Sequence, residues 1–126
     1  MKEAIQPEGL VRPAAPYSPV VVSGDLVYTA GQVGFDESGE LTADDITGQT
    51  EKLFENLVAC LGAAGCEPSD VIKVNAYLAD LGDFAAFNEV YKATFAEPYP
   101  ARTTVGVSLP GGILVEVEAV ARRPAR

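Results

Sequence analysis

The hydrophobic and polar positions in the first half of the chain predict a hairpin followed by a helix. Residues 20–32 contain two short β-rich runs on either side of the turn sequence SGD at 23–25, which is typical of an antiparallel hairpin. Thr42 followed by Asp45 resembles a capping box and predicts that a helix begins there. Gly65 is placed to end this helix, whose expected buried stripe has spacings of three and four and comprises Ile46, Thr50, Leu53, Leu57, Leu61 and Ala64.

A strand and a second helix are expected next. Residues 70–80 alternate between apolar and polar side chains, which predicts a half-buried strand whose inner face carries Ile72, Val74, Ala76 and Leu78. Asp83 can cap a second helix, which the prolines at 98 and 100 end. The apolar stripe expected for that helix consists of Phe84, Phe87, Tyr91 and Phe95.

The last two apolar runs, residues 103–109 and 113–121, flank the turn signal PGG at 110–112 and predict a second antiparallel hairpin. The expected order of elements is therefore ββαβαββ, with room for a further short strand at the N-terminus. This order is typical of an α+β fold in which two helices cover one face of a sheet.

Alternation along the second hairpin predicts which side chains share a face. Thr103 and Val105 are expected to join Val115 and Val117 on the face that the helices cover. The opposite face would carry four polar residues of interest, namely Arg102, Thr104, Glu116 and Glu118. Pairing Leu109 with Ile113 across the turn places Thr104 opposite Glu118 and leaves Arg102 within reach of a carboxylate.

The uncovered face is expected to be either solvated or buried against another copy of the chain. Leu114, Val120 and Tyr77 on that face favour a contact between subunits. Taken alone, the spacing of Arg102 and the glutamates favours a solvated or interfacial ion pair over a catalytic site. A guanidinium held against a sheet is also suited to bidentate capture of a small carboxylate, beside a glutamate that could move protons.

Length and charge narrow the functional classes. The 126 residues are enough for one domain, expected to span 1–126, and too few for two. The formal net charge is −9, and three of the nine basic residues crowd the C-terminus, which argues against nucleic acid as a partner. Neither a signal-peptide pattern nor an apolar run of membrane-spanning length is present, so we expect no membrane partner and a cytoplasmic protein.

The chain contains no histidine, which excludes Ser-His-Asp and Cys-His triads and most metal sites. We therefore expect neither a metal nor a cofactor. Cys60 and Cys66 are the only cysteines, one within the first helix pattern and one just after it. This placement favours two reduced, buried thiols over a disulfide.

Four segments give the chain a resemblance to the YjgF/RidA family, also called the endoribonuclease L-PSP family. They are APYS at 15–18, YTAGQV at 28–33, FNEVYKATF at 87–95 and PARTTVGVSLPGGILVEVEAVA at 100–121. The resemblance implies a chorismate-mutase-like, ferredoxin-like two-layer fold and a homotrimer with its sheets inward and ligand clefts between subunits. It also implies a hydrolase that converts reactive enamines and imines, such as 2-aminoacrylate, to 2-oxo acids and ammonia without metal or cofactor.

The same resemblance implies roles for individual residues. Arg102 matches the motif arginine that clamps the substrate carboxylate, Glu116 the glutamate that orients water, and Tyr17 a tyrosine that closes the cleft. Gly31 matches a backbone site near the substrate carboxylate. Two substrate-binding positions depart from the family pattern, because Thr104 stands where cysteine is common and Ala30 where a hydroxyl residue is common.

Several alternatives stay open at this point. Glu118 could be the functional carboxylate in place of Glu116, and Tyr17, set among prolines, could simply pack a loop. A non-catalytic trimer that binds small carboxylic acids, or that acts as a regulator or chaperone, would need Arg102 but not Glu116. A pathway enzyme such as an aminomuconate-type deaminase would use the same clamp on a longer substrate, whereas the acidic charge argues against a nuclease.

Overall fold

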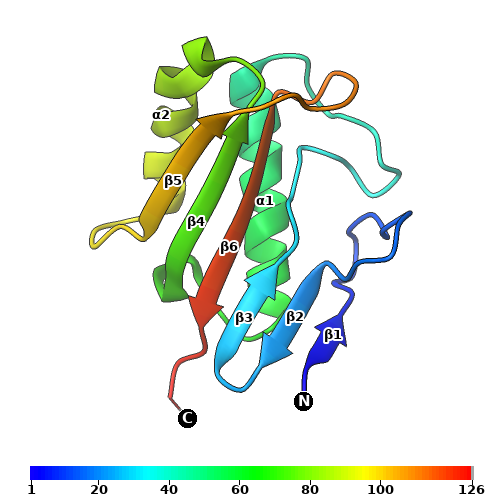
Figure 1. Ribbon diagram of the computed structural model, residues 1–126, viewed down its shortest axis with the longest axis vertical. Coiled ribbons are helices and arrows are strands. Elements are labelled where there is room, and N and C mark those ends of the chain that lie inside the picture. The colour runs from blue at the N-terminus through cyan, green and yellow to red at the C-terminus, as the bar shows by residue number, and fades with distance from the viewer. Residues whose placement is uncertain (126) are drawn as a thin grey trace.

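The computed structural model of the protein describes residues 1–125, in which two α-helices cover one face of a mixed six-stranded sheet (Figure 1). The sheet order is β1-β2-β3-β6-β4-β5, and β4 and β5 are its one parallel pair among these residues. The elements are β1 (Glu3–Ile5), β2 (Val20–Ser23), β3 (Leu26–Thr29), α1 (Ile46–Ala63), β4 (Val71–Leu78), α2 (Phe84–Thr94), β5 (Ala101–Gly106) and β6 (Val115–Arg122), with 3₁₀ turns at Pro68–Asp70 and Leu81–Asp83. The predicted sheet with two helices on one face is confirmed.

The first hairpin and the first helix follow the sequence closely. β2 and β3 pair through a turn at 24–25, where Gly24 has a φ of +61°, a conformation that favours glycine. The helix begins later than expected, because its N-cap is Asp45 and not Thr42. The Asp45 carboxylate accepts a hydrogen bond from the backbone N–H of Gly48, and Gly65, with a φ of +81°, follows the helix end.

The predicted hairpin of the last two strands is wrong, because β4 lies between β5 and β6. The two arms of the 107–114 connection are held to the end of β4 instead of to each other: Val107 N–H donates to Leu78 C=O, and Ala79 N–H donates to Leu114 C=O. A turn signal describes only the local chain reversal. It does not reveal that an eight-residue strand occupies the space between the two arms.

The prediction that Ile72 faces inward in β4 is also wrong. The register shifts between Val71 and Lys73, so that Val71 is buried and Ile72 is 47% exposed. Such a bulge breaks the two-residue period of the strand at that point. The alternation then resumes as predicted, with Val74, Ala76 and Leu78 all buried.

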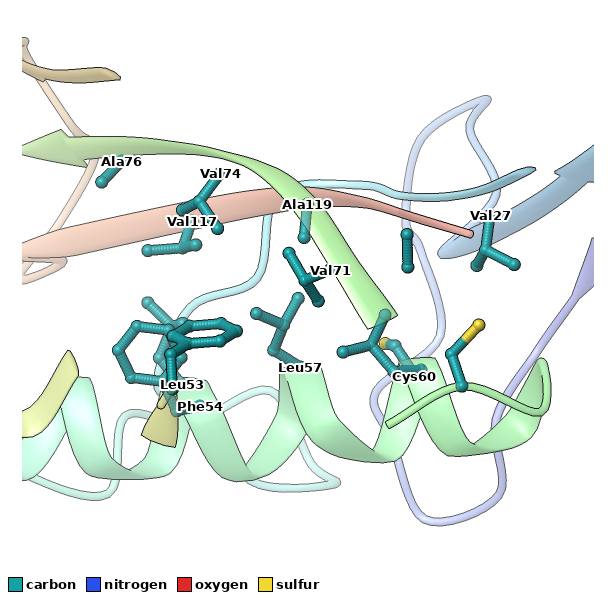
Figure 2. Close-up of a cluster of buried hydrophobic side chains, with 14 of the residues drawn as sticks. Val27, Leu53, Phe54, Leu57, Cys60, Val71, Val74, Ala76, Val117 and Ala119 are labelled. Carbon is teal, nitrogen blue, oxygen red and sulfur yellow. The ribbon is translucent and has the colours of Figure 1, made fainter. Parts of the chain in front are cut away.

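The core lies between α1 and the sheet. Figure 2 shows side chains of α1 directed toward the strands, including Leu53, Leu57 and Cys60 opposite Val74, Val117 and Ala119. An aromatic group joins α1 to α2, in which Phe54 makes ring contacts with Phe87, Tyr91 and Phe95. Phe84, the first member of the expected α2 stripe, remains 41% exposed.

Both cysteines are buried reduced thiols, as expected. Burial raises the pKa of Cys60 to about 12, so this thiol is protonated at neutral pH. Within residues 1–125, no helix has the length and apolar character that crossing a membrane requires.

Gln49 is a buried polar residue that fixes the chain just before β6. Its amide nitrogen donates to Ala43 C=O at 3.1 Å and to Gly112 C=O at 2.9 Å, and its amide oxygen accepts from Leu114 N–H at 2.9 Å. Because all three partners are backbone groups of loops, one side chain of α1 sets the path by which the chain enters β6.

Candidate active site

Arg102 lies on the helix side of the sheet. In the parallel pair of β4 and β5 it stands beside Val74, whose side chain is in the core. Its guanidinium carbon lies 4.6 Å from the ring centre of Tyr91 and 5.5 Å from those of Phe84 and Phe87, all on α2. Such stacking orients the guanidinium without consuming its hydrogen-bond donors.

The expectation that Arg102 shares a face with the glutamates is therefore wrong. Because β5 pairs in parallel with β4 and is not the hairpin partner of β6, its inward residues are Arg102 and Thr104 rather than Thr103 and Val105. Val105 is 39% exposed on the opposite side. Among residues 1–125, Arg102 forms no ion pair with a carboxylate, so its positive charge is available to a ligand.

A pocket of about 350 Å³ opens beside Arg102 and is lined by Asn88, Tyr91, Lys92, Tyr99 and Pro100. Three buried polar atoms near it have no hydrogen-bond partner in the described chain: Asn88 Oδ1, the Tyr91 hydroxyl and Thr104 Oγ1. Asn88 and Tyr91 line the pocket, and Thr104 follows Arg102 by two residues on β5. Buried polar groups are normally paired, so these atoms indicate a place for a polar ligand beside Arg102. We call Arg102, Thr104, Asn88 and Tyr91 the arginine half-site.

Sequence reasoning missed two members of this half-site. Tyr91 was assigned to an apolar stripe, and its buried ring does contact Phe87, but its hydroxyl is the unpaired atom. Burial raises the pKa of that hydroxyl, and the Arg102 charge offsets part of the rise. Asn88 precedes Tyr91 by three residues, which puts both on one side of α2. This spacing of three residues is the sequence signal that could have identified Asn88 as a neighbour of Tyr91.

Glu116 lies on the opposite face of the sheet. It stands beside Tyr77 in the antiparallel pair of β4 and β6, and its carboxylate covers the Cα of Gly31. A β-carbon added to Gly31 would come within 2.7 Å of Glu116 Cδ, so the absence of a side chain there makes room for the carboxylate. Burial, and next the charge of Glu118, raise the pKa of Glu116.

The two glutamates of β6 have different surroundings. Glu118 accepts hydrogen bonds at both oxygens, from the Tyr77 hydroxyl at 3.0 Å and from Asn75 Nδ2 at 3.3 Å. Within residues 1–125, no donor reaches the Glu116 carboxylate. Of the two, Glu116 is therefore the carboxylate whose oxygens are free to contact a ligand or water.

Tyr17 and Ala30 lie near Gly31. The backbone N–H of Ala30 donates to Pro19 C=O, which ties the 10–19 loop to this segment. Tyr17 and Gly31 together line a second pocket of about 380 Å³. Tyr17 is 56% exposed at the edge of this pocket. We call Glu116, Gly31, Ala30 and Tyr17 the glutamate half-site.

The sequence-predicted site residues thus fall into two groups separated by the sheet. Arg102 and Thr104 face α2, while Glu116 and Gly31 belong to the uncovered side that faces the viewer in Figure 1. Within one chain the guanidinium and the Glu116 carboxylate do not meet. No cluster of three or more acidic, cysteine or histidine side chains suited to a metal occurs in the described residues.

Comparison with known proteins identifies relatives of this chain. The family model described as endoribonuclease L-PSP matches residues 9–123. A RutC family protein of Pyrococcus horikoshii is 46% identical over 96% of this chain and 98% of its own length. A protein of Dermatophagoides farinae named 2-iminobutanoate/2-iminopropanoate deaminase is 40% identical over 86% of this chain and 87% of its own length.

The fold is also similar to that of solved structures. Escherichia coli TdcF with bound serine has a TM-score of 0.88 and 35% identity, covering 97% of this chain and 99% of its own. The matched residues of the family model include both half-sites, and the sequence and structural comparisons agree. The chain therefore belongs to the endoribonuclease L-PSP family, also known as the YjgF/RidA family.

Proposed function

We propose that the protein is an enamine/imine deaminase that hydrolyses 2-imino acids of the 2-aminoacrylate type to 2-oxo acids and ammonia. The observation that carries this proposal is the position of Arg102, a cation without a carboxylate partner among residues 1–125, beside three unpaired polar atoms. The name of the Dermatophagoides relative supports the reaction, and the serine bound by TdcF supports a ligand with a carboxylate and a nitrogen on the adjacent carbon.

The complete site would form between copies of the chain in a homotrimer. The arginine half-site of one subunit would face the glutamate half-site of the next, because one chain holds them on opposite sides of its sheet. In a cyclic assembly the same two surfaces meet at every interface, so each interface would carry one site. Tyr77 and Tyr28, the latter 47% exposed, lie on the uncovered face and would contribute area to the contact.

Arg102 would bind the substrate carboxylate through its planar fork. Two parallel N–H···O bonds fix both the position and the plane of a carboxylate, which a lysine ammonium does not do. The rings of Tyr91, Phe84 and Phe87 hold the guanidinium in one orientation. Asn88, Tyr91 and Thr104 then offer polar atoms around the same end of the substrate.

Glu116 would carry the proton chemistry. As a carboxylate it takes a proton from water while the water oxygen attacks the imine carbon, giving a tetrahedral carbinolamine. Returning that proton to nitrogen makes the carbinolamine neutral. Glu116 then takes the proton of the new hydroxyl and gives it to the same nitrogen, so that ammonia leaves as the C=O bond of the 2-oxo acid forms and both protons of the one water consumed end on ammonia. A raised pKa suits a carboxyl group that must both accept and return a proton near neutral pH. These steps use neither a metal nor a cofactor.

The direct test is an assay on imines generated in situ by an amino acid oxidase or a dehydratase. The proposal predicts faster release of ammonia and 2-oxo acid with the protein than without it, and unchanged turnover in EDTA. Binding of pyruvate that depends on Arg102, without acceleration for any imine in the panel, would contradict it. That result would support the second candidate, a non-catalytic trimer that binds small carboxylates, to which the serine-bound TdcF structure lends weight.

A further inference from the structure

A hydrogen-bonded group of three side chains lies next to Glu116 on the uncovered face. The Tyr77 hydroxyl donates to Glu118 Oε1 at 3.0 Å, and Asn75 Nδ2 donates to Glu118 Oε2 at 3.3 Å. Both donors come from β4, the strand beside β6. The Glu118 carboxylate is therefore held from two directions and cannot turn freely.

The register of the strands explains why Tyr77 contacts Glu118 and not Glu116. Tyr77 stands directly beside Glu116, and Asn75 stands directly beside Glu118. The tyrosine side chain is long enough to reach the diagonal neighbour on the same face. Glu118 follows Glu116 by two residues on one strand, so their Cα atoms are separated by about 7 Å.

We propose that Glu118 is a positioning residue for Glu116: Tyr77 and Asn75 fix the Glu118 carboxylate, which holds a localised negative charge on the same face of β6, two residues from Glu116. This inference rests on the proposed function, in which Glu116 exchanges a proton with water. Two like charges on one face favour protonation of one member of the pair. Glu118 accepts two hydrogen bonds, whereas among residues 1–125 no donor reaches Glu116, whose pKa is raised by burial and next by the charge of Glu118.

The charged and titratable groups that face Glu116 are few. Its own strand contributes Glu118, and β4 contributes Tyr77, whose pKa is raised by burial, by its hydrogen bond to Glu118 and by the charges of Glu118 and Glu116. Lys73 lies further along β4 and donates to Thr103 Oγ1 at 3.0 Å. Gly31 lies against the Glu116 carboxylate, and β3, the other neighbour of β6, places Tyr28 on the same face beside Val120. Glu118, two residues further along β6, is therefore the carboxylate of that strand that can act on Glu116.

The test measures the titration of Glu116 by NMR of carboxyl-labelled glutamate, with the signal assigned by its loss in Glu116→Gln. In Glu118→Gln the Glu116 midpoint should move to lower pH, because the neighbouring negative charge is gone. Glu118→Asp keeps the charge and should restore most of the wild-type midpoint. Glu55→Gln is the matched control, since it removes one exposed glutamate charge on α1 and should leave the midpoint unchanged.

Tyr77→Phe tests the positioning itself. It frees one oxygen of Glu118 without removing the charge, and should move the Glu116 midpoint to lower pH by less than Glu118→Gln does. An unchanged or higher Glu116 midpoint in folded Glu118→Gln would overturn the inference. Should that variant fail to fold, an unchanged midpoint in Tyr77→Phe would overturn it equally.

The pH profile of imine hydrolysis separates this inference from the proposed function. If wild-type protein hydrolyses imines and the acid limb shifts to lower pH in Glu118→Gln, both stand. If hydrolysis occurs but neither the limb nor the NMR midpoint moves, only the role of Glu118 fails. If the wild-type protein hydrolyses no imine, the proposed function fails, whereas the NMR midpoint still reports whether Glu118 acts on Glu116.

Discussion

Arg102 and Glu116 lie on opposite faces of one sheet, Arg102 beside the buried Val74 and Glu116 beside Tyr77 on the uncovered side. This relationship decides how a reaction that needs both residues can take place. Within a chain the sheet separates the guanidinium from the carboxylate. Two copies can bring them together if the α2–β5 edge of one faces the uncovered side of the next.

Replacing Arg102 tests the carboxylate clamp. Arg102→Ala should lower kcat/KM for 2-iminopropanoate at least about 100-fold, because a charge-assisted bidentate contact is lost. Arg102→Lys keeps the charge but loses the fork, and should cost about tenfold. The measurement is ammonia release at several imine concentrations. Near-wild-type activity in Arg102→Ala would remove the arginine from the mechanism.

Replacing Glu116 tests the proton transfer. Glu116→Gln should lower kcat by about 10²- to 10⁴-fold, the usual contribution of a general base, and leave binding of pyruvate nearly unchanged. Since the pKa of Glu116 is raised and the ionised form takes the proton, wild-type activity should fall as pH drops through that raised pKa. The acid limb should therefore lie above the usual carboxyl range and be absent from the residual activity of Glu116→Gln.

Gly31→Ala tests whether the space above Gly31 positions the carboxylate. The new methyl group would displace the carboxylate end of the flexible Glu116 side chain, so hydrolysis should fall while the free energy of unfolding changes by no more than about 0.5 kcal/mol, the scale of an ordinary surface substitution. Gly62→Ala is a matched control, because a β-carbon at this helical position meets no atom within 4 Å and should stabilise the fold by about 0.5–1 kcal/mol. Additive losses in the Gly31→Ala, Glu116→Gln double variant would argue against direct coupling.

Gln49→Leu tests the buried amide that guides the chain into β6. It leaves Ala43 C=O, Gly112 C=O and Leu114 N–H without this partner, and should lower the free energy of unfolding by about 2–4 kcal/mol. Urea denaturation of the purified protein measures this loss. A change below about 0.5 kcal/mol, the scale of an ordinary surface substitution, would show that water replaces the amide without cost.

Much of the fold was predictable because local patterns specify it. The β2–β3 hairpin, the α1 stripe and the inward residues of β6 follow from alternation, helical spacing and glycine turns. The pairing of β5 was not predictable in this way. The PGG turn at 110–112 also suits a wider connection, and the choice between them is made by β4, a partner distant in sequence.

The candidate site, too, was predictable from the sequence only in part. Arg102 and Glu116 were singled out by strand alternation, and the family resemblance added Gly31 and Tyr17; their two-group arrangement became visible only with the parallel pairing of β5. Asn88 and the Tyr91 hydroxyl were missed because a helical stripe reports which side of a residue is buried, not whether its polar atom has a partner. The different surroundings of Glu116 and Glu118 depend on side chains of β4.

A subunit-mixing experiment tests the shared site most directly. Arg102→Ala and Glu116→Gln, each nearly inactive alone, are denatured together, refolded at equal concentration and assayed on 2-iminopropanoate. Random assembly pairs an intact Arg102 with an intact Glu116 of another copy at about a quarter of the interfaces, so about a quarter of wild-type activity should return. Refolding Arg102→Ala with the Arg102→Ala, Glu116→Gln double variant should restore nothing. Activity of the first mixture no higher than the mean of the two variants alone would contradict a site shared between copies.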